Sequence, residues 1–555
     1  MSTMPNAAIY FEPDGYVVTG DKIMGRQAAG NSFLRAAVAQ AGDAPLWCLT
    51  ASERAAQAFN TLARSIDAGV KTAWCPTLKI GKLRDVGTLY LPGPNLDHYA
   101  SQRLRVGIDA FSICGITHTT ASHGAMDAVA SLLTAPVMPW DALICTSNAA
   151  KGTVNTVMTE QMELLRWRFG HDVKLDLPRL PVIPLGIQCE DFNFTAEDRA
   201  KARAELQIGE DDIVVLFVGR LSYHAKAHPH AMMLALEEVA QKTGRNIVLV
   251  QCGWFANKEI GQAFQTAARK VCPSVRCLFT DGKNPKSRNA SWAAADIFAS
   301  LSDNFQETFG ITPIEAMAAG LPVVVSDWDG YKDTVPDGQV GFRIPTWTLE
   351  NDNVHHFAAR YEAGTDSYDR YCGYTCQTVA VDPSALTDRL TALVEQPGLR
   401  QKLGEAGKKR AQATYDWAVV YKQYQALWAE LASIRAAGAQ SDQVRTAPKA
   451  APTRMDPYKA FASYPSHAVD SSTRLTLLAS DPGDAYARYL ALDTFSYAKA
   501  ILPSATFAER ALHVIGDSVD IDVATFARVM GIPAADTAMI ASMLAKMGLI
   551  RLSRG

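Results

Sequence analysis

Two acidic residues at a fixed spacing are the strongest chemical signal in the chain. Glu307 and Glu315 stand eight positions apart in the segment QETFGITPIEAMAAGLPVVVSDWDG (306–330). The first acid precedes a predicted helix and the second lies inside it, so both belong to one junction between a strand and a helix. A lone acid there is usually only a helix cap. Two acids, followed by a second loop that ends in glycine, indicate a binding site.

The residues between the two acids predict how this helix begins. Thr312, Pro313 and Glu315 have the spacing of the N-cap, first and third residues, which is a capping box with proline in its favoured position. The backbone N–H groups of Gly310, Ile311 and Thr312 would then point outward from the helix start. Such free N–H groups are what a phosphate group binds.

A second segment, VGRLSYHAKAHPH (218–230), supplies positive charge. A strand is predicted to end at Gly219, Arg220 follows directly, and Lys226 comes six residues later. Two cations at the carboxyl edge of a parallel sheet can neutralise a diphosphate and stabilise it as it leaves. A solvated loop is the alternative for this segment alone. Because the acidic segment is predicted at the same sheet edge, the two together favour a nucleotide-diphosphate site.

The elements that must position these residues follow from the apolar runs. Almost wholly apolar runs, separated by amphipathic stretches, predict parallel strands covered by helices on both faces. They occur at 213–219, 246–253, 275–282, 295–301 and 321–327. This pattern predicts a doubly wound α/β domain, whose sites lie where strands lead into helices.

The first 190 residues repeat the pattern less regularly, so we expect two Rossmann-like domains that face a cleft. Their strand candidates are AIYF, PLWCLT, TLYLPG, FSICGIT, DALICTS and LPVIPLG. The predicted organisation is an N-terminal Rossmann-like domain at 1–190 and a second one at 191–435, which carries an insertion at 346–378 and ends in a long helix. An exposed linker at 436–470 and a small, mostly helical C-terminal domain at 471–555 follow.

The stretch 213–345 resembles the donor-binding half of a retaining glycosyltransferase of family 4, which has the GT-B fold. The residues that carry the resemblance are VGRL with Lys226, the E-x7-E pair, and the closing PVVVSDWDG. A fainter similarity runs through PVIPLGIQCEDF at 181–192 and on to about residue 434. The resemblance implies transfer of a sugar from a nucleotide-diphosphate sugar with retention of the anomeric configuration. It also implies that 1–190 is the acceptor domain and 191–435 the donor domain.

The resemblance also implies a role for each matched residue. Arg220 and Lys226 would contact the donor diphosphate, Glu307 the hydroxyls of the transferred sugar, and Glu315 the ribose hydroxyls. Backbone groups of Gly219 and of the residues Gly310, Ile311 and Thr312 would contact phosphate and sugar. The family's first glycine loop corresponds to MGRQAAGNSFLRA (24–36), where Gly25 and Gly30 are separated by four residues instead of being adjacent, and a helix start is expected near Gly30.

Two histidines follow the strand candidate FSICGIT, in THTTASHG (117–124). The family often has a histidine in this region near the reacting sugar, so His118 is preferred to His123, with a structural role as the alternative for each. Neither has the spacing of a metal site, and the sequence lacks a convincing Asp-x-Asp strand end of the kind used by metal-dependent transferases. We therefore expect no essential metal and no cofactor other than the nucleotide sugar as co-substrate.

Composition limits the remaining possibilities. Lys+Arg 54 against Asp+Glu 57 argues against binding of the whole chain to nucleic acid. No apolar run reaches the length of a membrane-spanning helix and no secretion signal is recognisable, so a cytoplasmic protein is expected, with peripheral membrane association left open. The ten scattered cysteines are interpreted as mostly buried, reduced thiols.

Residues 505–555, with a short helix, a turn, a second helix and a small strand, resemble a winged helix. From 476 to 555 seven Lys/Arg face eight Asp/Glu, and the expected recognition helix at 533–547 carries only Asp536 and Lys546. DNA phosphates require several cations, so a protein partner or self-association is favoured over DNA.

Two alternatives to a glycosyltransferase remain at this stage. One is a nucleotide-sugar epimerase with the same fold, and the other is a DNA-binding or sugar-sensing regulator. The nucleobase, the sugar and the acceptor stay open, and the acceptor classes considered are a glycan, a lipid-linked saccharide, a protein and a small molecule.

Overall fold

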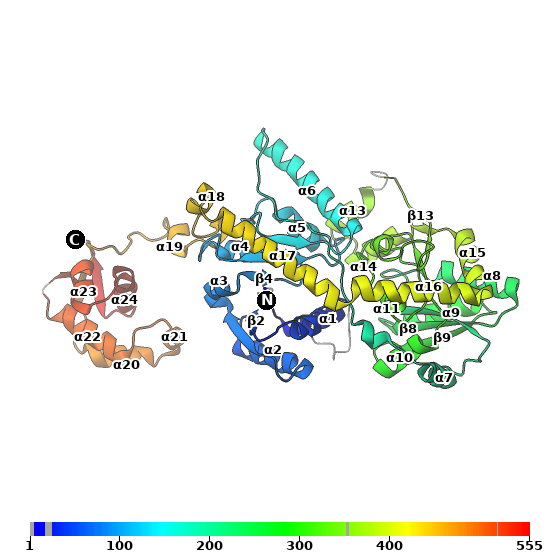
Figure 1. The fold of residues 1–555 in the computed structure, drawn as a ribbon. Helices are drawn as coiled ribbons and strands as arrows, with labels where there is room; N and C mark the ends of the chain where they lie inside the picture. The colour runs from blue at the N-terminus through cyan, green and yellow to red at the C-terminus, as the bar shows by residue number, and fades with distance from the viewer. Residues whose placement is uncertain (1–4, 17–24, 351–354, 519, 555) are drawn as a thin grey trace. The chain divides into compact units, whose positions relative to one another are not determined.

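The computed structural model describes residues 5–16, 25–350, 355–518 and 520–554. The chain divides into two compact units, 1–451 and 452–555, and each is described by itself. The first unit contains two six-stranded sheets, and the second contains a three-stranded sheet with helices. Figure 1 shows the elements of each unit.

The first sheet is wholly parallel, with strand order β3-β2-β1-β4-β5-β6. Its strands are β1 (Ala8–Tyr10), β2 (Leu46–Thr50), β3 (Thr72–Pro76), β4 (Thr88–Tyr90), β5 (Ser112–Ile116) and β6 (Ala142–Ile144). Its helices are α1 (Gly25–Ala39), α2 (Glu53–Ile66), α3 (Leu83–Val86), α4 (Leu96–Arg103), α5 (His123–Ser131) and α6 (Asn148–Phe169). Strand β3 was not predicted, and the candidate LPVIPLG forms only one isolated bridge, between Val182 and Cys145 at the end of β6.

The second sheet has the same topology, in the order β12-β11-β10-β7-β8-β9, and is also parallel. Its strands are β7 (Ile213–Arg220), β8 (Ile247–Trp254), β9 (Arg276–Asp281), β10 (Ile297–Ser300), β11 (Val323–Ser326) and β12 (Gly341–Ile344). Its helices are α7 (Ala196–Glu205), α8 (His230–Thr243), α9 (Lys258–Val271), α10 (Pro285–Ala294), α11 (Ile311–Ala318), α12 (Tyr331–Thr334), α15 (Pro383–Glu395) and α16 (Pro397–Arg410). The predicted α/β fold of two Rossmann-like domains is confirmed.

Burial explains why the central strands are apolar throughout. Residues 213–218 of β7 and all four residues of β10 are buried, because helices cover both faces of the sheet. The strand order reverses between β7 and β10, and the polar residues therefore gather at the carboxyl ends of these two strands.

One helix lies in the range predicted for the donor domain but packs on the other sheet. Figure 1 shows α16 and α17 (Trp417–Gly438) passing from one domain to the other. Buried residues of α17 join the core of the first sheet, among them Tyr421, Tyr424 and Trp428. The segment 444–451 also packs on this domain, where Ala451 is buried beside Trp140. The stretch from 436 to 451 is therefore not the exposed linker that its composition suggested.

The predicted insertion contains regular structure. It begins with β13 (Thr346–Trp347), which pairs antiparallel with β14 (Ala380–Val381), and it carries α13 (His355–Glu362) and α14 (Tyr368–Cys376). The antiparallel pair brings the two ends of the insertion together, so the insertion leaves the second sheet and returns to it at one place.

The second unit has its own hydrophobic core, which includes Leu475, Phe526 and Leu544. A three-stranded antiparallel sheet, in the order β16-β15-β17, is formed by β15 (Arg474–Leu477), β16 (Ile521–Asp522) and β17 (Ile550–Ser553). Its longer helices are α20 (Pro482–Leu490), α22 (Ala505–Gly516), α23 (Val523–Met530) and α24 (Ala534–Lys546). The short helices α19 (Pro457–Ala460) and α21 (Asp493–Ser496) belong to the same unit, whereas α18 (Asp442–Arg445) lies in the first unit. The winged-helix resemblance stays a prediction.

Candidate active site in the interdomain cleft

A cavity of about 610 Å³ lies at the carboxyl ends of β7, β8 and β9 and extends to the first domain. Most of the predicted site residues line it together: His118, Gly219, Arg220, Lys226, Glu307, Gly310, Ile311 and Thr312. The residues from Gly219 to Thr312 lie at one edge of the second sheet, as the carboxyl-end rule requires, and His118 reaches the same cavity from the first sheet.

Three glycines form one wall of this cavity where neighbouring strands end. Gly219 has φ +153°, and a Cβ on Gly253 would lie 1.9 Å from the Gly219 carbonyl oxygen. A Cβ on Gly282 would lie 2.8 Å from the Cα of Gly253. Side chains are therefore excluded from this wall, and a ligand can approach the backbone closely.

The loop that carries Lys226 is held by hydrogen bonds from the loop after β10. Asn304 Nδ2 donates to the His224 carbonyl at 3.0 Å, and Gln306 Nε2 donates to the Ala225 carbonyl at 3.1 Å. Arg220 also donates to the Ala225 carbonyl, at 2.7 Å. Both cations are therefore attached to one well-anchored loop, which preorganises positive charge at the cavity.

Lys226 and Glu307 form an ion pair inside the cavity, and their side chains are 22% and 15% exposed. Burial alone would raise the pKa of Glu307, but the charge and the hydrogen bond of Lys226 outweigh burial and hold the pKa below its usual value. The carboxylate is consequently ionised at neutral pH and can accept hydrogen bonds from hydroxyl groups.

The predicted capping box is wrong. Helix α11 begins at Ile311, its N-cap is Gly310 with φ +80°, and no side chain caps it. A Cβ on residue 310 would lie 2.0 Å from the ring of Tyr331, so only glycine fits this left-handed position. Thr312 and Pro313 are therefore the second and third helical residues. The N–H groups of the first turn have no partner within a helix, so the missing N–H of proline costs no hydrogen bond at this position.

The early start of α11 leaves Thr312 with a different role from the one predicted. Its hydroxyl oxygen is buried and has no hydrogen-bond partner among the described residues, and the residue lines the cavity. Buried hydroxyls normally have partners, so Thr312 is suited to bind a ligand with its side chain.

Glu315 lies in a neighbouring cavity of about 300 Å³, which shares Lys283, Arg288 and Ile311 with the first cavity. Burial raises the pKa of Glu315 to about 7, although the charge of Arg288 opposes this shift. The two acids of the E-x7-E pair thus face adjoining compartments, connected along the start of α11.

The first domain contributes less than the sequence suggested. His118 and Thr119 line the large cavity, as do Ala28 and Ala29. Helix α1 begins at Gly25, so the expected helix start near Gly30 is wrong. Gly30 lies inside the helix, where a Cβ would lie 2.3 Å from the Gly15 carbonyl oxygen, and it lines a narrow pocket with His118. The preceding residue of the glycine loop, Met24, is outside the described residues.

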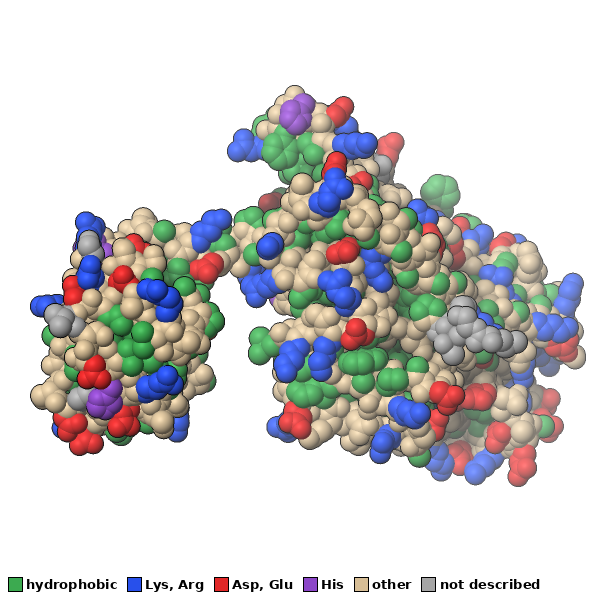
Figure 2. Space-filling model, turned by 60° about the vertical axis from the view of Figure 1, so that its left-hand side comes forward, with side chains coloured by type: hydrophobic (Ala, Val, Ile, Leu, Met, Phe, Trp, Pro, Cys, Tyr) green, Lys and Arg blue, Asp and Glu red, His purple; other side chains and the backbone are tan. Residues whose placement is uncertain are grey.

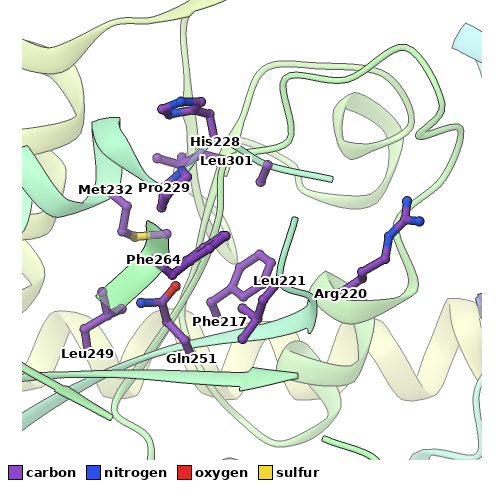
Figure 3. Close-up of a pocket in the computed structure, with 11 residues that line it drawn as sticks. Phe217, Arg220, Leu221, His228, Pro229, Met232, Leu249, Gln251, Phe264 and Leu301 are labelled. Atoms are coloured by element: carbon purple, nitrogen blue, oxygen red, sulfur yellow. The ribbon is translucent and has the colours of Figure 1, made fainter. Parts of the chain in front are cut away.

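A narrow pocket of about 20 Å³ lies behind the loop of Lys226, between β7, β8 and α8 (Figure 3). It is lined mainly by apolar side chains such as Phe217 and Phe264, and Arg220 points away from them. The amide nitrogen of Gln251 in this pocket has no hydrogen-bond partner among the described residues. This space suits about one water molecule, so the pocket supports the loop and is too small for a sugar or nucleotide.

Sequence reasoning missed several residues of the site. Lys283 and Arg288 add two cations, and Trp254 lies under Lys283 with 5.3 Å between Nζ and the ring centroid. Asp329, with φ +42°, is a half-buried acid outside the cavity lining, and its pKa is raised well above its usual value by burial and by the charge of Glu307. The Lys-Asn segment after β9 was visible in the sequence, but only the sheet order places it beside the glycine wall. The WDG turn follows β11 and lies near Glu307 instead.

Within the described ranges no group of three or more His, Cys, Asp or Glu side chains is arranged to hold a metal ion. In the same ranges no single helix is long and apolar enough to cross a membrane. Helices α23 and α24 are long and apolar enough only when they are taken together, and the chain bends by 108° between them.

Residues 198–361 match the family model described as Glycosyl transferases group 1. This part of the chain is similar to group 1 glycosyl transferases. The match includes Arg220, Lys226 and the E-x7-E acids, whereas His118 and the glycine loop lie outside it. The resemblance stated from the sequence is thereby confirmed for the donor half, and the epimerase and regulator alternatives are not favoured.

Curated relatives of the chain include two kinds of bacterial enzyme. The D-inositol 3-phosphate glycosyltransferase of Nocardia farcinica is 30% identical over 171 residues, 30% of this chain and 37% of that protein. The phosphatidyl-myo-inositol mannosyltransferase of Mycobacterium leprae is 31% identical over 144 residues, 26% of this chain and 29% of that protein. The matched region thus spans less than half of each relative.

A solved structure of Anabaena HepE in complex with UDP and glucose is also similar. It is 15% identical, with a TM-score of 0.49, and the match covers 76% of this chain and 99% of that one.

Proposed function

We propose that this group 1 glycosyl transferase moves a hexose from a nucleotide-diphosphate sugar to an acceptor with retention of anomeric configuration, as a member of family 4. The observation that carries the proposal is the meeting of Arg220, Lys226 and Glu307 with the glycine wall and the start of α11 in one cleft. Cations and backbone N–H groups suit a diphosphate, and an ionised carboxylate suits sugar hydroxyls.

The two compartments support the division of roles implied by the E-x7-E pair. Glu307, beside Lys226, is assigned to the transferred sugar, and Glu315, in the adjoining cavity, to the ribose of the nucleotide. A protonated Glu315 could donate a hydrogen bond, and an ionised one could accept two, so either state can bind vicinal hydroxyls.

The residues of the cleft are better suited to stabilise a leaving group than to form a covalent intermediate. The acid nearest the assigned sugar position, Glu307, is already paired with Lys226, so it is poorly suited to act as a nucleophile. We therefore assign catalysis mainly to stabilisation of the departing diphosphate by Arg220 and Lys226. The departing phosphate would accept the proton of the acceptor, with His118 near the reacting carbon and no essential metal.

Incubation of the full-length protein with UDP-, GDP- and ADP-linked hexoses, scored for released nucleoside diphosphate, tests the proposal. Release from at least one donor is expected, and the Lys226→Ala variant should lose it. The anomeric proton of the product, followed by NMR, tests retention. Absence of release from every donor, in a protein that also fails to bind UDP, GDP or ADP by calorimetry, would refute the proposed function.

For localisation, we propose a cytoplasmic enzyme that associates peripherally with membranes through the end of α6. Leu164, Trp167 and Phe169 there are 51%, 77% and 58% exposed, with Arg166 and Arg168 between them. Figures 1 and 2 show this end projecting from its domain, with hydrophobic side chains next to basic ones. Aromatic and basic residues on one projecting element suit the interface of an anionic bilayer.

Cosedimentation with vesicles of phosphatidylglycerol and phosphatidylcholine tests this localisation. Binding should disappear in the Trp167→Ser, Phe169→Ser double variant. It should persist in Trp347→Ser, because that residue is equally exposed (70%) but lies on β13. Equal binding of both variants would exclude the end of α6 as the contact.

A further inference from the structure

The insertion packs directly on the donor side of the cleft through α14. Asn304, which anchors the Lys226 loop, also donates to the backbone carbonyl of Cys372 at 3.5 Å. A Cβ on Gly373 would lie 3.1 Å from the Cβ of His224, so the helix backbone lies against the loop itself. Cys372 and Cys376 are buried at this contact. Helix α14 is therefore a fixed part of the donor side.

The same insertion also contacts the first domain, on the opposite side of the cleft. The Tyr368 hydroxyl forms a hydrogen bond of 3.0 Å with the Thr119 hydroxyl. The rings of Tyr361 and His123 are stacked, with centroids 3.6 Å apart and planes at 21°. Thr119 stands next to His118, and both line the large cavity. The insertion thus joins the loop of His118 to the loop of Lys226.

The aromatic residues of the insertion form a packed ladder. Tyr371 covers the second face of Tyr361, with centroids 4.8 Å apart and planes at 16°. An ion pair of 2.7 Å between Arg360 and the buried Asp366 closes the turn between α13 and α14. The stacked rings fix the insertion against His123 of the first domain. Because both faces of Tyr361 are covered, this ring has no free face on which a sugar could stack.

We propose that Tyr368 is a positioning residue, which holds the loop 117–122 against the donor cavity and so places His118 beside the reacting sugar. The inference rests on the proposed function, and it assigns to the insertion a role in setting the geometry across the cleft. Tyr368 itself does not line the donor cavity, so its effect must pass through Thr119 and the residues next to it.

Steady-state hydrolysis of the donor identified by the panel of nucleotide sugars tests this role. Tyr368→Phe keeps the ring and removes one hydrogen bond, so kcat should fall about 5-fold while KM for the donor stays unchanged. The matched control is Tyr374→Phe on the same helix, because Tyr374 is 41% exposed and should change neither constant.

A second comparison separates positioning from a general structural effect. If Tyr368 acts through the loop of His118, Tyr368→Phe should cause no further loss of kcat in a His118→Ala background. Independent, multiplicative losses would overturn the proposal, as would an unchanged kcat in Tyr368→Phe.

Hydrogen exchange in the presence of UDP, GDP and ADP provides a readout that does not require turnover. The amides of 117–122 should exchange faster in Tyr368→Phe than in wild type, with no change in the strands of either sheet. If this loop exchanges at the wild-type rate in Tyr368→Phe, Tyr368 does not position it, whatever the activity of the variant. Failure of the wild-type protein to use any nucleotide sugar would instead count against the proposed function.

Discussion

At the scale of single residues, the site depends on buried acidic side chains, and nearby positive charges compensate the burial of each acid to a different degree. Lys226 lies beside Glu307 and compensates its burial, whereas Glu315 is buried with only the partial help of Arg288. The two acids therefore differ in protonation although they belong to one motif. The spacing of the motif was readable from the sequence, but this difference was not, because it depends on neighbours that only the fold supplies.

The two diphosphate cations give the first prediction. Lys226→Ala and Arg220→Ala should each lower donor turnover about a hundredfold, since loss of one preorganised charge removes on the order of 3 kcal/mol of transition-state stabilisation. Lys258→Ala, at the exposed start of α9, is the matched control and should keep wild-type turnover. Full turnover in either cleft variant would contradict the assignment.

The E-x7-E acids should respond to pH with opposite signs. The raised pKa of Glu315, about 7, means that the unfolded chain loses this proton first as pH rises, so stability falls between about pH 4.5 and 7. Glu315→Gln should therefore stabilise the protein at pH 8 by at most about 3 kcal/mol and have little effect at pH 4.

Glu307 has a lowered pKa, so its ionised form stabilises the fold above the usual pKa, and this stabilisation is lost as pH falls. Glu307→Gln should consequently destabilise the protein at pH 8, and its stability should converge on that of wild type as pH falls through the lowered pKa of Glu307. Thermal unfolding of both variants across this range measures the two effects. The same sign for both acids would show that Lys226 does not compensate Glu307.

At the scale of elements, the apolar runs predicted most strands because both faces of each sheet are buried. Strand β3, with the sequence TAWCP, was missed because its residues are only partly buried and it lies at the sheet edge. The start of α11 was misplaced for another reason. TPIE has the local pattern of a capping box, but the packing of Tyr331 against Gly310 decides where the helix begins.

That packing predicts unequal effects of two similar substitutions at the ends of α11. Gly310→Ala would place a Cβ 2.0 Å from the Tyr331 ring, and Gly320→Ala would place one in open space, although both glycines have φ near +80°. Backbone strain alone is about 1 kcal/mol, so Gly320→Ala should be mildly destabilising. Gly310→Ala should cost several kcal/mol and weaken nucleotide binding, as measured by thermal unfolding and calorimetry. Equal destabilisation would mean that Tyr331 moves aside freely.

At the scale of the whole molecule, the sequence indicated two Rossmann-like domains and a further C-terminal part, but not how the chain returns from one domain to the other. Composition changes near residue 436, where Ala and polar residues increase, and this change suggested the end of folded structure. Instead, α17 continues to Gly438, and Val444, Ala447 and Ala451 pack beside Trp140. Small alanine side chains fit this shallow contact, and such a contact leaves little periodic signal in the sequence.

The place of truncation therefore decides the outcome of removing the C-terminal unit. A chain that ends at Ala451 keeps the whole donor cleft and the α17 contacts, so donor hydrolysis and the midpoint of thermal unfolding should equal those of the full-length protein. A chain that ends at Arg435 uncovers Trp140 and its neighbours Leu104 and Met138, and its midpoint should fall by several degrees. Light scattering on the 1–451 chain tests whether the C-terminal unit mediates self-association, because oligomers should then be present only in the full-length protein. If the 1–451 chain is folded but hydrolyses no donor, residues 452–555 must contribute to catalysis, and the two units would not be functionally independent.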